Sequence, residues 1–243
     1  MKKYSFLIIA LLAVSQSRSQ FVLKGKIEYE KVVNVHKQMG DNSWSAEIKK
    51  NIPEHQTTYF NLSFNNEKSL YEPGREIQQK RNPFMGDAPA SSNIVFSDFT
   101  NHQAVTFKQV FDEAFLIQDS LKRYKWRITN DTRKIAGFDC RRATTVIMDS
   151  VFVVAFYTDE IVTPGGPESF NGLPGMILGI VIPRLFTNWY ATKVELETVK
   201  EAALIAPKKG KKTTTTAGME KTVMESLKRW GEWGQKYLWQ ILI

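Results

Sequence analysis

The chain has 243 residues, 42% of them hydrophobic and 12% aromatic, an ordinary globular composition with enough length for one domain that has its own core. The formal net charge is +8, but three positive charges fall in the first 19 residues and four more are Lys208, Lys209, Lys211 and Lys212, which leaves +1 for everything else. A single cysteine, Cys140, excludes an intramolecular disulfide framework.

The first twenty residues have the pattern of a secretory signal peptide. Lys2 and Lys3 precede an apolar run at residues 6–14, and Ser17-Arg18-Ser19 offers a small-residue cleavage site before Gln20. The run is too short for a membrane-spanning helix, and the absence of a nearby cysteine argues against a lipid anchor at the cleavage site. We expect residues 1–19 to be removed and residues 20–243 to be exported to the periplasm or the outer membrane.

A hydrophobic period of two dominates the exported part. Residues 27–35, 59–64 and 124–129 alternate between apolar and polar side chains, and Lys31 interrupts the apolar face of the first segment. Further strand candidates are residues 94–97, 104–111, 114–118, 143–148, 151–157, 176–182 and 189–196. Many short strands predict a mainly β fold, and a sheet of this length must curl to protect its edges. We therefore expect a strongly curved antiparallel sheet or an open barrel with a C-terminal helix.

Two stretches break this rhythm. Residues 72–92 are rich in Pro, Gly, Asn and Gln and predict a long surface loop. Residues 219–243 carry apolar side chains close to helical spacing, which predicts a helix weakened by Gly231 and Gly234. The expected organisation is a single β domain, residues 20–243, with a helical segment from about residue 217.

A turn-forming segment leads into one of the apolar strands. Pro174 and Gly175 suit the central positions of a type II turn, because proline presets the first φ and glycine accepts the positive φ of the second. Gly172 adds a second flexible point, and Pro183 ends the strand at residues 176–182. We interpret this segment as structural: Gly172, Leu173, Pro174, Gly175, Met176 and Ile177.

The same segment resembles the signature of the GLPGLI family, secreted envelope proteins of Bacteroidota, with Met176 in place of the second leucine. Further motifs agree with the layout of that family: Trp126, residues 134–144, residues 156–161, and Gly166-Pro167. The resemblance covers roughly residues 94–196. It implies an envelope protein, with an outer-membrane β-barrel such as a TonB-dependent transporter as the expected partner, and it implies no biochemical activity.

Catalytic motifs are largely absent from the sequence. His36, His55 and His102 stand far apart, so we expect no metal ion and no cofactor, and nothing predicts a nucleic-acid partner. Asp159 and Glu160 form an acidic pair that could act as a general acid or base, although an exposed strand end is the simpler interpretation. Trp126 and Tyr157 could line a binding groove or belong to the core.

Three features leave alternatives open. The terminal segment with Trp230 and Trp239 could pack on the sheet, meet a partner or contact a membrane. The loop with Lys208, Lys209, Lys211 and Lys212 could be solvated or could contact an anionic surface. Cys140 could be buried or could pair with another chain.

These patterns favour a noncatalytic envelope protein that holds an apolar ligand or docks on an outer-membrane β-barrel. The alternative is an envelope hydrolase that uses Asp159 or Glu160.

Overall fold

The computed structural model describes residues 22–41, 43–77, 90–196, 199–208 and 212–243. The expected signal peptide and most of the loop predicted at residues 72–92 lie outside them. The described strands are β1 (Gly25–Asn34), β2 (His55–Phe64), β3 (Lys68–Pro73), β4 (Ile94–Asp98), β5 (Gln103–Val110), β6 (Glu113–Ser120), β7 (Arg127–Ile135), β8 (Phe138–Ile147), β9 (Val151–Thr158), β10 (Met176–Ile182), β11 (Thr187–Glu195) and β12 (Lys212–Thr214).

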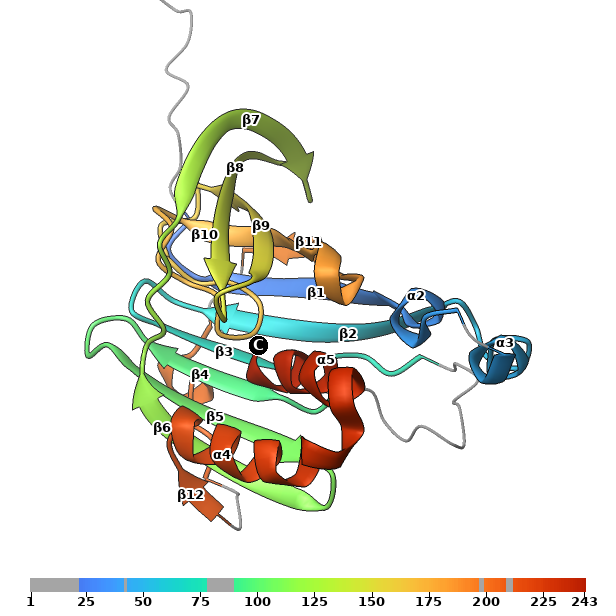
Figure 1. Cartoon of the computed structure of the whole chain (residues 1–243). Coiled ribbons are helices and arrows are strands. Elements are labelled where there is room, and N and C mark those ends of the chain that lie inside the picture. Colours follow the sequence, from blue (N-terminus) through green and yellow to red (C-terminus); the bar gives the residue numbers. More distant parts are fainter. Residues whose placement is uncertain (1–21, 42, 78–89, 197–198, 209–211) are drawn as a thin grey trace, which may run out of the picture.

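These strands form one 12-stranded sheet in the order β12-β6-β5-β4-β3-β2-β1-β11-β10-β9-β8-β7. All neighbours pair antiparallel except β12, which runs parallel to β6. Because β7 and β12 lie at opposite ends of the order, the sheet is open (Figure 1). The predicted fold class, a strongly curved sheet with a C-terminal helix, is confirmed.

Two long helices follow the last strand, α4 (Thr216–Leu227) and α5 (Gly231–Leu242), with the short 3-10 turn η3 (Lys228–Trp230) between them. One apolar cluster joins Ile241 of α5 to Phe115 and Ile117 of β6. Another joins Trp239 of α5 to Val153 and Trp189, at the other end of the sheet. The sheet therefore curls around α5, which packs against both of its ends (Figure 1). Of the alternatives left open, packing on the sheet is the one that the structure adopts for Trp239.

The remaining helical elements are short. They are α2 (Val35–Met39), α3 (Ser43–Lys49), η1 (Pro183–Leu185) and η2 (Glu201–Ala203). The helices α2 and α3 lie in the connection between β1 and β2, at one side of the molecule (Figure 1).

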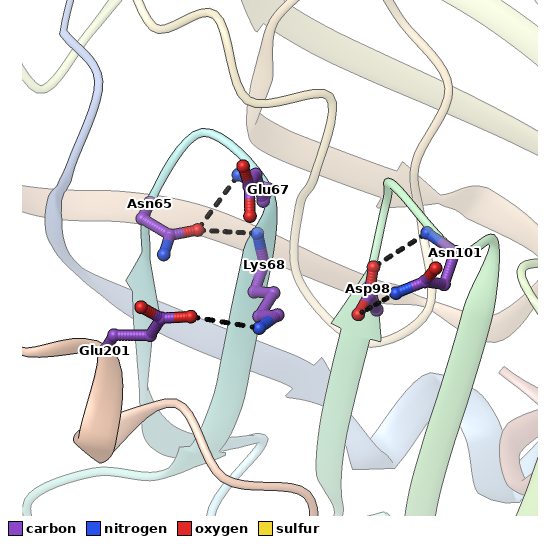
Figure 2. Close-up of polar contacts among 6 residues, drawn as sticks. All are labelled: Asn65, Glu67, Lys68, Asp98, Asn101 and Glu201. Carbon is purple, nitrogen blue, oxygen red and sulfur yellow. Dashed lines mark hydrogen bonds and ion pairs between the residues drawn. The ribbon is translucent and has the colours of Figure 1, made fainter.

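Polar side chains fix two of the hairpin turns. The side-chain oxygen of Asn65 accepts hydrogen bonds from the backbone nitrogens of Glu67 and Lys68 at 2.9 and 2.7 Å, between β2 and β3. Asp98 accepts from the backbone and side-chain nitrogens of Asn101 at 2.8 and 3.0 Å, between β4 and β5 (Figure 2). Asn and Asp favour such turns because their short side chains bond to backbone two or three residues ahead.

The turn of the signature segment, predicted as type II, has a different hydrogen-bond pattern. A type II turn would join the amide of Met176 to the carbonyl of Leu173; instead, Met176 donates to Ile161 O at 2.9 Å. The amide of Gly175 donates to Leu173 O at 2.8 Å, which closes a smaller turn around Pro174. Both glycines do adopt positive φ, 86° at Gly172 and 138° at Gly175. Leu173, Met176 and Ile177 are buried in the core.

Candidate functional site

Three of the four aromatic residues proposed for binding belong to the interior. Tyr157 is 1% exposed and Trp239 is 9% exposed, and both lie in the same apolar cluster. Trp126 is half-buried, and its indole nitrogen donates to Asn171 O at 2.9 Å, beside the signature segment. The structure thus joins two motifs that are 45 residues apart in sequence. Trp230, by contrast, is 48% exposed.

The acidic pair gathers no catalytic partners. Asp159 is exposed, and neither its carboxylate nor that of Glu160 forms a hydrogen bond or an ion pair within the described part of the chain. The backbone of Glu160 accepts from Val22 at 2.8 Å, which ties this loop to the beginning of the described chain. Across the described ranges, no group of three or more His, Cys, Asp or Glu residues could hold a metal ion.

Cys140 is fully buried in the core, and burial raises the pKa of its thiol to about 12. Of the lysine loop, the structure describes Lys208 and Lys212, both exposed; Lys209 and Lys211 lie outside the described residues. Lys212 lies 3.8 Å from a carboxylate oxygen of Glu113 and 5.7 Å from the centre of the Phe115 ring.

The sheet and α5 enclose a set of buried and half-buried polar residues that the sequence did not single out. We call this set the inner polar cluster: Lys31, Tyr71, Asn93, Lys108, Lys122, Glu168 and Trp189. Lys31, Lys108 and Glu168 are 6%, 5% and 2% exposed. Two cations and one carboxylate at such depth are uncommon, because burying a charge without compensation is costly.

Glu168 is the acidic centre of the cluster. One carboxylate oxygen accepts from Asn93 at 2.8 Å, while the other has no hydrogen-bond partner among the described residues. Its backbone has a φ of 54°, a conformation that few residues other than glycine adopt. The loop therefore bends sharply at Glu168 and directs this carboxylate into the interior, where its charge acts on the surrounding lysines.

Two lysines hold the end of α5. Lys108 on β5 donates to Ile241 O at 2.6 Å, and Lys122 donates to Leu242 O at 2.5 Å. The last carbonyls of a helix lack partners within the helix and carry partial negative charge, so they suit ammonium groups. Burial lowers the pKa of Lys108 to about 7 and that of Lys122 to about 8, against the opposing effect of Glu168.

Lys31 lies between two aromatic rings. Its ammonium group is 5.0 Å from the centre of the Trp189 ring and 5.9 Å from that of Phe60, distances typical of cation–π contacts. Burial lowers the pKa of Lys31, and Glu168 opposes this shift. The hydroxyl of Tyr71 and the indole nitrogen of Trp189 are buried without a hydrogen bond of good geometry within the described ranges. Within the inner polar cluster, Lys108 and Lys122 are the residues that bond to the end of α5.

The sequence contained a signal for part of this cluster. Lys31 interrupts an otherwise apolar face, and Lys108 occupies an inward position between the buried residues Thr106 and Val110. A charged residue at an inward position of a strand predicts a buried partner. Glu168 lies in a loop without periodicity, so no pattern pointed to it.

A group of aromatic side chains lies on the outer surface of the molecule. Phe111, Trp230 and Tyr237 form a group of rings that we call the surface aromatic cluster. Phe111 stacks on Tyr237 with centroids 5.4 Å apart and meets Trp230 edge to face at 5.7 Å. Phe111 is 42% exposed and has a φ of 53°, a strained conformation for a bulky residue.

No helix in the described ranges combines the length and the apolar character that crossing a membrane requires. A comparison with curated protein sequences gives no match.

Two solved structures of PNGF-II, in space groups C2 and P21, resemble the fold. They give TM-scores of 0.50 and 0.54 at 17% and 15% sequence identity, and the alignments cover 79% and 82% of this chain. The chain spans only 30% and 32% of the length of these structures. A family model described as the N-terminal domain of the N-glycanase peptide matches residues 77–219. Since that match covers more than half of the sequence, the chain belongs to the family of N-glycanase peptide N-terminal domains.

Proposed function

We propose that this chain is a noncatalytic binding protein of the cell envelope that docks on a protein partner through its surface aromatic cluster. The observation that carries the proposal is the exposure of Phe111 and Trp230, at 42% and 48%, in one packed group with Tyr237. Trp and Tyr are enriched among the residues that contribute most to protein interfaces. Phe111 adopts a strained positive φ, and such strain concentrates at functional sites.

The hydrolase alternative has less support. General acid and base catalysis needs a carboxylate placed against a nucleophile, a second carboxylate or a bound water. The carboxylates of Asp159 and Glu160 form no hydrogen bond or ion pair with protein groups within the described residues. The carboxylate of Glu168 is 2% exposed and bonded to Asn93, so a substrate cannot reach it in this conformation.

An outer-membrane β-barrel protein is the partner that we propose first, following the resemblance of the sequence to envelope proteins. A second candidate is the glycan of an N-glycoprotein, because the family description names an N-glycanase. Exposed aromatic rings offer flat apolar faces on which the apolar side of a sugar ring can pack. Both partners would use the same three residues.

The experiment places a photoreactive amino acid at position 230 and irradiates cells that produce the protein. We expect a crosslinked product with an outer-membrane protein, and we expect Phe111→Ala to abolish it because the supporting ring is lost. The control places the same group at the exposed Lys24. In parallel, binding to one purified glycoprotein is compared before and after removal of its N-glycans. Equal crosslinking from both positions, together with no glycan-dependent binding, would refute the docking surface.

A further inference from the structure

A groove with a volume of about 470 Å³ opens where four segments meet. They are the connection between β6 and β7, the turn between β8 and β9, the first turns of α4 and the end of α5. This volume lies within the range of small-molecule sites, roughly 300 to 1,000 Å³. The groove shares no residue with the surface aromatic cluster, so a ligand of the groove is independent of the docking proposal.

Three basic residues line the groove, Lys122, Arg123 and Lys125, and Glu220 is the acidic side chain of the lining. Arg123 and Lys125 are exposed, and their side chains form no hydrogen bond or ion pair within the described ranges. Lys122 is held against Leu242 O, so it contributes a fixed charge at the inner end. The first amides of α4 are already bonded to Asp119 and Thr215, so the positive character comes from the side chains.

The lining also has apolar side chains, which are those of Val146, Ile147, Met148, Leu242 and Ile243, and Tyr124 adds an aromatic ring. Val146 is 57% exposed, although it is a β-branched aliphatic residue on a strand. The aliphatic side chains carry no hydrogen-bonding groups that could satisfy the hydroxyls of a saccharide, and the Tyr124 hydroxyl already contacts Ser169 Oγ at 3.2 Å.

We propose that the groove binds an anionic amphiphile, with a phosphate or carboxylate head on Arg123 and Lys125 and an acyl or alkyl chain along Val146 and Met148. Arginine and lysine bind such heads through charge-assisted hydrogen bonds. Each methylene of the alkyl chain that leaves water for the aliphatic side chains makes binding more favourable. A neutral sugar lacks both the negative charge that suits Arg123 and Lys125 and the alkyl chain that suits Val146 and Met148.

Octyl phosphate, used below its critical micelle concentration, is the probe for isothermal titration calorimetry with the full chain. We expect saturable binding at one site. Arg123→Gln combined with Lys125→Gln should weaken it by about tenfold or more, since two charge-assisted contacts are lost. Lys24→Gln combined with Lys200→Gln removes the same charge from positions elsewhere and should leave the affinity unchanged.

Two further measurements test the contacts of the phosphate head and of the alkyl chain separately. Octanol should bind with an affinity that does not respond to Arg123→Gln and Lys125→Gln. Val146→Asn should weaken the affinity for octyl phosphate by about threefold, because part of the apolar contact is lost. The side chain is exposed, so the fold should tolerate this change, and circular dichroism checks that it does.

The proposal is overturned if octyl phosphate shows no saturable binding, or if the Arg123 and Lys125 variant binds as tightly as the control. Inorganic phosphate that binds as well as octyl phosphate would also overturn it, since the groove would then be a plain phosphate site.

Discussion

Gly172 and Gly175 both adopt positive φ, yet a side chain would meet different surroundings at each position. A Cβ at Gly175 would lie 2.0 Å from Thr158 O, whereas nothing lies within 4 Å of a Cβ at Gly172. Gly175→Ala should therefore lower the free energy of unfolding by about 2 to 4 kcal/mol, through strain and overlap with the backbone of β9. Gly172→Ala should cost only about 1 kcal/mol, because it adds backbone strain alone.

Urea unfolding of the two variants measures this difference. The test is sharp because both substitutions add the same single carbon in the same segment. Equal stability of the two variants would mean that the contact between Gly175 and Thr158 is absent in solution.

Lys108 makes stability depend on pH. Its folded pKa is about 7, below the value near 10.4 of an unfolded lysine, so the unfolded chain binds more protons between these values. The free energy of unfolding should therefore rise as pH rises through this window, by about 2 kcal/mol between pH 7 and 9 from this residue. The neighbouring charges are Lys31, Lys122 and Glu168.

The comparison is Lys108→Met, which keeps much of the volume and removes the titrating group. We expect its urea-derived stability to rise less steeply between pH 7 and 9 than that of the parent chain. Parallel profiles of the two proteins would show that Lys108 keeps an ordinary pKa. The contribution of Cys140, whose raised pKa lowers stability above about pH 8.5, is common to both proteins and cancels.

At the scale of elements, the sequence predicted those strands in which one face is buried and the other is accessible to solvent. β1 alternates between buried and half-buried residues along its whole length, and it was predicted within two residues at its start. β3 was missed because its three consecutive buried residues give no alternation. β7 is exposed along most of its length, so the pattern at residues 124–129 identified only its beginning.

The carboxyl-terminal helix was predicted as one weakened segment and is two helices. Gly231, which was expected to weaken it, has a φ of 56° and begins α5 after the turn η3. The polar run that forms β12 is strand-like in sequence, but its parallel pairing with β6 could not be predicted, because that pairing depends on the position of the chain in space. Glu168 of the inner polar cluster was missed because it is buried in a loop, which leaves no periodic trace in the sequence.

At the scale of the whole molecule, α5 is the element that joins the two ends of the sheet. Trp239 packs with residues of β9 and β11, while Leu238 and Ile241 pack with residues of β5 and β6. Lys108 and Lys122 add two hydrogen bonds to the last turn of the helix. Because α5 packs on both parts of the sheet, its loss would expose the apolar side chains of both. We therefore expect a single cooperative unfolding transition.

Trp239→Ala tests this expectation. Removal of a buried indole should cost about 3 to 5 kcal/mol, and if the molecule is one cooperative unit, tryptophan fluorescence and far-ultraviolet circular dichroism should shift to the same lower urea midpoint. The matched control is Trp230→Ala, which removes a half-exposed indole and should shift the midpoint far less. Two separate transitions in the Trp239→Ala variant would mean that the β4–β6 side and the β9–β11 side unfold independently, and that α5 does not join them.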